Sequence, residues 1–193
     1  RIAAFHTNAE GAMRSTEFMS PPSRGFDLLR EAALSLSAEH RGIANLINPR
    51  QTQAVRYADS PLSSASDPLA AGPPPGEAMP EQPLDDRRHL TDLIGPCFTV
   101  LVFNAGEGHA QRDACEAEAK KAVARGLTVQ VHELRLTPAT GDAFCALGAQ
   151  QGAVYLLRPD GHVAARWQLP QPGMLARAIE RAACAGATVK DTA

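Results

Sequence analysis

The chain has 193 residues, of which 44% are hydrophobic and 21% charged, and its formal net charge at neutral pH is −2. These values are ordinary for a globular protein, and the absence of a basic stripe excludes a surface built for nucleic acid or an anionic membrane. No apolar run approaches the roughly 20 residues of a membrane-spanning helix. The chain begins with RIAAFHTNAEGAMR, without an initiator methionine or the apolar segment of a secretory signal. We therefore expect an excised or processed piece of a longer, cytoplasmic protein.

Residues 1–48 are predicted to form two or three short helices. Apolar residues recur at helical spacing from Ile2 to Met13, and the pair Pro21-Pro22 ends that helix. A second amphipathic helix follows, with Ser23 as its N-cap. Its apolar stripe consists of Phe26, Leu29, Ala33 and Leu36. Helices this short bury too little apolar surface to fold alone, so we expect their stripes to pack on another part of the protein.

Residues 49–88 have a different composition, rich in Pro, Ser, Ala and Gly and without a period. The triple proline at 73–75 favours a stiff polyproline segment. This composition predicts either a linker or an extended arm that wraps a surface.

Residues 89–193 are predicted to form a compact α/β domain. Apolar runs and alternation predict strands over 98–103, 127–134, 153–158 and 162–167, and helices over about 111–125, near 137–148 and from Pro172 onward. A strand–helix–strand opening implies a parallel pair of strands, and a closing hairpin adds antiparallel ones. The order β-α-β-α-β-β-α is that of a thioredoxin-like fold with a mixed sheet.

Thiol–disulfide chemistry does not fit this sequence. It needs a reactive cysteine after the first strand and a second one three residues later, but FNAGEGHAQRD at 103–113 contains no cysteine. Gly152-Ala153 stands where oxidoreductases of this fold carry a cis-proline before the third strand. The four cysteines are Cys97, Cys115, Cys145 and Cys184. No two of them form a C-x-x-C pair, so we interpret them as free thiols in a reducing compartment.

No other catalytic, cofactor-binding or metal site is predicted. The metal-ligand types at His109, Cys115, His132 and Cys145 match no zinc spacing. The loop with Gly106 and Gly108 lacks the remaining residues of a dinucleotide or phosphate motif. There is no nucleophile elbow, and the sequence places no acid–base pair together.

The segment YLLRPDGHVAARW at 155–167 contains a charged turn. Pro159 and Asp160 suit the centre of a type I turn, and Gly161 supplies the positive φ of a following bulge. The turn does not account for Arg158 and Arg166. We expect them to be solvated, with pairing to a partner surface as the alternative.

This segment, together with LTDLIGPCFTVLVF at 90–103, resembles the C-terminal thioredoxin-like domain of FAD-dependent aromatic-ring monooxygenases, the phenol hydroxylase and 3-(3-hydroxyphenyl)propionate hydroxylase group. MSPPSRGFDLLREAALSLSAEH and NPRQTQAVRYADSPL resemble the segment that joins the flavin domain to that C-terminal domain. The resemblance therefore covers nearly the whole chain. It divides the chain into a helical remnant of the flavin domain (1–48), a linker (49–88) and a thioredoxin-like domain without C-x-x-C (89–193).

The resemblance implies a whole enzyme in which NAD(P)H reduces FAD and the flavin hydroperoxide hydroxylates a phenolic ring. The FAD-binding segments of the family lie upstream of the first residue of this chain. We therefore assign no catalytic, cofactor-binding or metal residue here and expect no bound cofactor and no activity from this piece alone. The implied roles are support of the flavin domain and contacts between the subunits of a homodimer.

Two other hypotheses remain open on the sequence. The chain is alternatively an independent thioredoxin-fold binding or dimerisation module without redox activity, because it combines a long linker with apolar helices. A thiol oxidoreductase is kept for contrast only, and normal turnover in an insulin-reduction assay would revive it.

Overall fold

The structure is a computed structural model that describes residues 2–40, 42–43 and 55–184. The chain divides into two compact units, Arg1–Val55 and Arg56–Ala193. Each unit is described by itself below.

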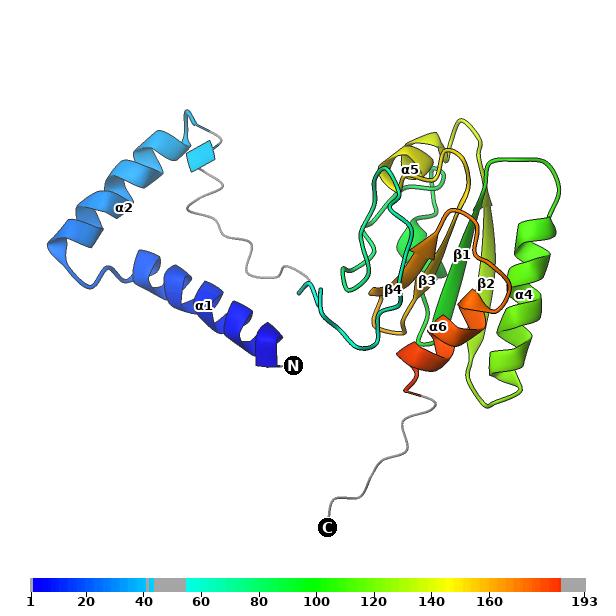
Figure 1. The fold of residues 1–193 in the computed structure, drawn as a ribbon. Helices are drawn as coiled ribbons and strands as arrows, with labels where there is room; N and C mark the ends of the chain where they lie inside the picture. The colour runs from blue at the N-terminus through cyan, green and yellow to red at the C-terminus, as the bar shows by residue number, and fades with distance from the viewer. Residues whose placement is uncertain (1, 41, 44–54, 185–193) are drawn as a thin grey trace, which may run out of the picture. The chain divides into compact units, whose positions relative to one another are not determined.

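The first unit contains two helices, α1 (Ile2–Met19) and α2 (Arg24–Ser37), which are labelled in Figure 1. The predicted cap of α2 is confirmed, because the Ser23 side chain accepts a hydrogen bond from the backbone N–H of Phe26. Asp27 forms ion pairs with Arg24 at 3.1 Å and with Arg30 at 2.7 Å on the surface of α2.

The apolar side chains of this unit are exposed. α2 has no buried residue, although its sequence is amphipathic. The large exposed apolar side chains on the two helices are Phe5, Met13, Met19, Phe26, Leu28, Leu29, Leu34 and Leu36. Two helices that leave this much apolar surface open lack a core of their own in the described residues, as the sequence predicted.

The second unit is built on a four-stranded mixed sheet. The strands are β1 (Phe98–Asn104), β2 (Val129–Arg135), β3 (Ala153–Leu157) and β4 (Val163–Trp167), in the order β2-β1-β3-β4. β1 is parallel to β2 and antiparallel to β3, and β3 is antiparallel to β4. The helices are η1 (Leu90–Leu93), α4 (Ala110–Val123), α5 (Gly141–Ala146) and α6 (Met174–Ala182). The predicted α/β class and β-α-β-α-β-β-α order are confirmed.

The two faces of the sheet are covered by different structures. α4 and α6 lie over one face (Figure 1), where Val100, Val102, Leu156 and Trp167 form a core with Leu175 and Ile179 of α6. On the other face, Phe103, Phe144, Tyr155 and Leu157 form a second core, to which Met79 and Leu84 contribute.

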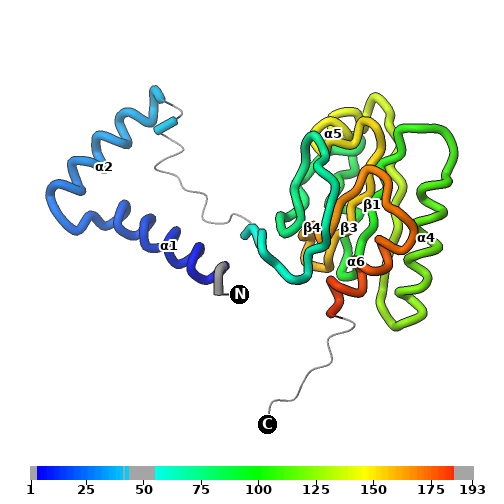
Figure 2. Tube along the Cα trace, in the orientation of Figure 1, coloured from blue at the N-terminus to red at the C-terminus, as the bar shows by residue number. Residues whose placement is uncertain are grey.

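Residues 56–88, called the strap below, belong to this second unit. Figure 2 shows the strap passing beside β4. Its backbone pairs with that strand: Gly76 N–H donates to Val163 O at 2.8 Å, and Val163 N–H donates to Glu77 O at 2.8 Å. Of the two alternatives for 49–88, the extended arm therefore describes residues 56–88, while 49–54 lie outside the described residues. The compact unit begins at Arg56, whereas the composition of the sequence placed the start of the α/β domain at residue 89.

The charged turn between β3 and β4 is a backbone bend, as predicted. Gly161 has φ +77°, and Arg158 N–H donates to His162 O at 2.9 Å. The expectation that both arginines are solvated is wrong. The Arg158 side chain is only 13% exposed and pairs with Asp160, and Arg166 is 8% exposed. Arg166 is buried because the strap lies over it and supplies its hydrogen-bond acceptors.

The prediction that α6 contains Pro172 in its first turn is also wrong. The helix begins at Met174, after Gly173 in the left-handed conformation. The carboxylate of Glu118 on α4 accepts hydrogen bonds from the backbone N–H groups of Gly173 and Ala176. A side chain from another helix thus satisfies the free N–H groups at this helix start.

Candidate functional site

The best-placed polar cluster lies where β1 and β2 end. Because these strands are parallel, their carboxyl ends meet at one edge of the sheet, and ligand sites of α/β sheets are usually found at such an edge. Asn104 ends β1, Glu133 and Arg135 lie at the end of β2, and His109 is the N-cap residue of α4. This is also the place where a redox-active thioredoxin fold carries its cysteines.

Glu133 is the centre of the cluster. Its side chain is 9% exposed, and its carboxylate accepts a hydrogen bond from Asn104 Nδ2 at 2.7 Å. The second carboxylate oxygen lies 2.6 Å from Nδ1 of His109. Asn104 Nδ2 also donates to Gly108 O at 2.7 Å, so the loop that contains Gly106 and Gly108 is tied to both strands.

Arg135 completes the cluster and lies against the ring of His109. Its Nη2 lies 3.0 Å from His109 Nε2 and 3.3 Å from Gly108 O. The same Nη2 lies 3.3 Å from His109 Nδ1, so the guanidinium is close to both ring nitrogens. Each of the four side chains therefore contacts at least one other side chain of the cluster.

The pKa of Glu133 reflects this environment. Burial by itself raises the pKa, but hydrogen bonds from Asn104 and His109 and the charge of Arg135 outweigh burial, so the pKa lies below its ordinary value. The carboxylate is therefore ionised at neutral pH.

The pair His109–Glu133 was missed by the sequence analysis, which placed no acid and base together. The two residues are 24 positions apart and meet only because β1 and β2 are parallel and in register. A sequence signal does exist: polar residues end both strands of a predicted parallel pair. The contact between His109 Nδ1 and Glu133 ties the 105–109 loop to β2.

The other metal-ligand types noted in the sequence are separate. Cys115 is buried in α4, and Cys145 is exposed on α5, while His132 lies on β2. Among the residues that the structure describes, no three His, Cys, Asp or Glu side chains gather around a common point.

The cysteines are free thiols in two environments. Cys97 and Cys115 are buried, and Cys145 and Cys184 are exposed. Burial, with a smaller contribution from the charge of Glu118, raises the pKa of Cys115 to about 12. This thiol is therefore protonated at neutral pH and is a poor nucleophile.

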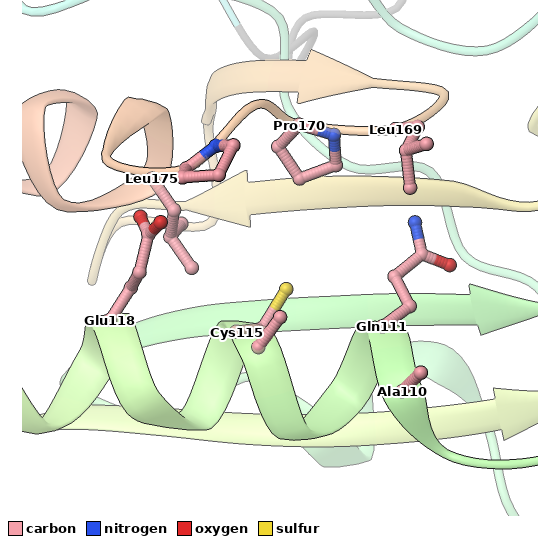
Figure 3. A pocket seen from close by; sticks show the side chains of 9 residues that line it. Ala110, Gln111, Cys115, Glu118, Leu169, Pro170 and Leu175 are labelled. Atoms are coloured by element: carbon pink, nitrogen blue, oxygen red, sulfur yellow. The ribbon is translucent and has the colours of Figure 1, made fainter.

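A cleft of about 370 Å³ opens beside Cys115, between α4 and the segment that leads into α6 (Figure 3). Its wall is mostly apolar and consists of Ala110, Gln111, Ala114, Cys115, Glu118, Leu169, Pro170, Pro172 and Leu175. The polar groups among them already have partners. Gln111 Nε2 donates to Gln168 O at 3.2 Å, and Glu118 caps α6. The cleft thus presents a neutral thiol and hydrocarbon to its interior.

No family model matches the sequence, and no curated protein is similar to it in sequence. Solved structures are similar in fold. Native and K252c-bound RebC-10x is 22% identical, with a TM-score of 0.60, and the match covers 93% of this chain and 34% of that one. A ternary complex of aklavinone-11 hydroxylase with FAD and aklavinone is 23% identical, with a TM-score of 0.54, covering 79% of this chain and 33% of that one.

The flavin-dependent monooxygenase PieE, solved with FAD and substrate, is 21% identical, with a TM-score of 0.51, and the match covers 87% of this chain and 31% of that one. At these identities the comparisons establish the fold. The resemblance to flavin monooxygenases expected from the sequence is confirmed at that level, and the chain spans about a third of the length of the structures it matches. None of the described helices is long and apolar enough to cross a membrane.

Proposed function

We propose that the chain is the C-terminal portion of an FAD- and NAD(P)H-dependent aromatic-ring hydroxylase. The observation that carries the proposal is the agreement between two independent lines: the ordered sequence motifs and the fold of flavin-dependent enzymes over most of this chain. The chain spans only a third of those enzymes, so the flavin chemistry belongs to the rest of the protein.

In this proposal the portion is structural. Where a redox-active thioredoxin fold has its cysteines, this chain has a closed network of Asn104, His109, Glu133 and Arg135. Such a network stabilises a loop, and it offers no thiol for electron transfer. The role that remains is to support the flavin domain and to contribute to contacts in a cytoplasmic homodimer.

The exposed apolar faces of α1 and α2 support the same role. Phe5 is 68% exposed and Leu29 is 65% exposed, and faces of this kind mark interaction surfaces. Their partner is the upstream flavin domain of the same polypeptide. The helices then complete that domain.

A second candidate function is an independent thioredoxin-fold binding or dimerisation module. The observation that favours it is again the apolar surface of α1 and α2, because a second copy of the chain is an equally apolar partner.

The coding sequence upstream of Arg1 and an FAD titration distinguish these proposals. The first predicts an open reading frame with a dinucleotide-binding fingerprint, and no flavin bound to the 193-residue chain alone. A start codon close to Arg1 would favour the independent module. Stoichiometric FAD binding by the 193-residue chain would contradict both.

A further inference from the structure

The two outer strands of the sheet are protected in different ways. β2 carries Gln130, His132, Glu133 and Arg135, and charged side chains on an outer strand discourage pairing with another chain. β4 reads Val-Ala-Ala-Arg-Trp, is buried at each position, and lies beside the uncharged, buried strand β3. Short segments with little charge pair readily with a second copy when their edge is open. In this chain, the strap occupies that edge.

The strap forms hydrogen bonds with the backbone groups of β4 that point away from β3. Ser64 N–H donates to Ala164 O at 2.9 Å, and Asp67 N–H donates to Arg166 O at 3.1 Å. Further along, Gly76 and Glu77 exchange hydrogen bonds with Val163. The strap segment 64–77 therefore takes the place that a neighbouring strand would occupy.

Arg166 holds this segment. Its guanidinium Nη1 donates to Ala71 O at 3.0 Å and to Gly72 O at 2.7 Å. Its backbone N–H donates to Ser66 Oγ at 3.0 Å. A buried cation needs acceptors, and the strap supplies two of them to Nη1, while the buried Nε of Arg166 has no hydrogen-bond partner. Departure of the strap would break both of these hydrogen bonds and expose the guanidinium and the two carbonyls to water.

The strap and the sheet fit closely at this point. Gly72 has φ +85°, and a side chain there would collide with the hydroxyl of Tyr155. Gly148 has φ +62°, and a Cβ there would lie 2.6 Å from the backbone nitrogen of Ala71. The hydroxyl of Tyr155 donates to Leu147 O at 2.7 Å. The strap can approach Arg166 only because both positions are glycine.

We propose that segment 64–77 is a self-docked cover of the β4 edge, latched by Arg166, and that its release turns β4 into a docking edge for a second copy of the chain. The pairing would join the two β4 strands through the backbone groups that the strap now occupies. This inference stands independently of the proposed flavoenzyme.

The test compares Arg166→Met with Arg125→Met in the 193-residue chain. Methionine keeps the volume of Arg166 but removes its donors. Arg125 is a matched control because its side chain is 61% exposed and pairs with Glu180, on the α4–α6 side of the sheet. Amide hydrogen exchange is measured by mass spectrometry. We expect exchange at Ser64, Asp67 and Gly76 to accelerate about tenfold or more in Arg166→Met, the ratio for losing a charge-assisted hydrogen bond, and not in Arg125→Met.

Light scattering at several protein concentrations then tests the docking edge. At equal concentration, Arg166→Met is expected to show at least twice the mass of the parent chain. In the larger species, the β4 amides of Val163 and residue 166 stay protected while the strap amides exchange. Unchanged strap exchange in a folded Arg166→Met variant overturns the proposal, and so does accelerated exchange at the mass of the parent.

If Arg166→Met fails to fold, hydrogen exchange in the parent chain tests whether the strap opens separately from the sheet. Its exchange is measured in increasing, sub-denaturing urea. The proposal predicts that the strap amides exchange through a local opening, at lower urea than the amides of β1 and β3. Strap amides that exchange only together with β1 and β3 would show that no separate latch exists.

Discussion

Replacing Glu133 with glutamine tests whether the cluster at the end of β1 and β2 is a closed, charge-dependent network. Glutamine has nearly the shape of glutamate but no charge, and only one of its two terminal atoms is an oxygen, whereas both carboxylate oxygens of Glu133 are in contact with cluster partners. The substitution weakens the contact between residue 133 and His109, and it removes the charge attraction between residue 133 and Arg135. A hydrogen bond to a charged group contributes about 1.5–3 kcal/mol. Because the His109 side chain is half exposed, we expect a loss near the low end, about 2 kcal/mol.

The assay is urea or thermal unfolding followed by the fluorescence of Trp167, the single tryptophan, which is 1% exposed. A loss of about 2 kcal/mol corresponds to a decrease in Tm of about 4–8 °C for a protein of this size. The control is Glu116→Gln. Glu116 pairs with Arg112 on the surface of α4, and an exposed pair of this kind contributes at most about 1 kcal/mol.

The stabilisation by Glu133 is expected to depend on pH. The pKa of Glu133 is lower in the folded chain than its ordinary value, so the unfolded chain binds the proton more readily. The stabilisation is therefore complete above the ordinary glutamate pKa and is lost as pH falls through the folded pKa. The difference between the parent and Glu133→Gln should shrink towards zero over that range. Equal unfolding midpoints at pH 7, or a difference that persists unchanged in acid, would refute the network.

Three further predictions follow from single contacts. Glu118→Ala removes the cap of α6 and should lower the free energy of unfolding by about 1 kcal/mol, measured in urea; an unchanged midpoint would show that the cap contributes nothing. Iodoacetamide at pH 8 should modify exposed Cys145 far faster than Cys115, whose pKa is about 12, and equal rates by mass spectrometry would contradict that burial. Gly72→Ala should cost more stability than Gly108→Ala, because both have positive φ but only Gly72 lies against Tyr155; equal costs in thermal unfolding would exclude the close fit.

The elements with a local pattern could be predicted from the sequence. The strands, the order of the helices, the cap at Ser23 and the bend at Gly161 all depend on residues within a few positions of one another. Helical spacing, alternation and turn chemistry record such local requirements directly.

The contacts between distant segments could not be predicted in this way. The contacts of the strap with Arg166 leave no pattern in the sequence, because they use backbone carbonyls, which any residue can supply. Arg166 therefore looked like a solvated residue, although the strap buries it. The pair His109–Glu133 likewise requires the register of β1 on β2, which pairs Asn104 with Arg135. Register is a property of the folded sheet and leaves only a weak trace in the sequence.

The cluster of Asn104, His109, Glu133 and Arg135 satisfies its own polar groups, and the cleft beside Cys115 has an apolar wall with a protonated thiol. The proposal assigns the flavin chemistry to the remaining two thirds of the enzyme, because the chain spans about a third of the structures it matches.

The most direct test of this account is NAD(P)H oxidation by the complete protein encoded by the gene that contains this chain. The account predicts a protein that purifies with FAD and oxidises NAD(P)H faster when a phenolic compound is added, with formation of a hydroxylated product. The 193-residue chain alone should show neither FAD nor activity. A complete protein that purifies without flavin and oxidises no NAD(P)H in the presence of phenolic compounds would contradict the central proposal.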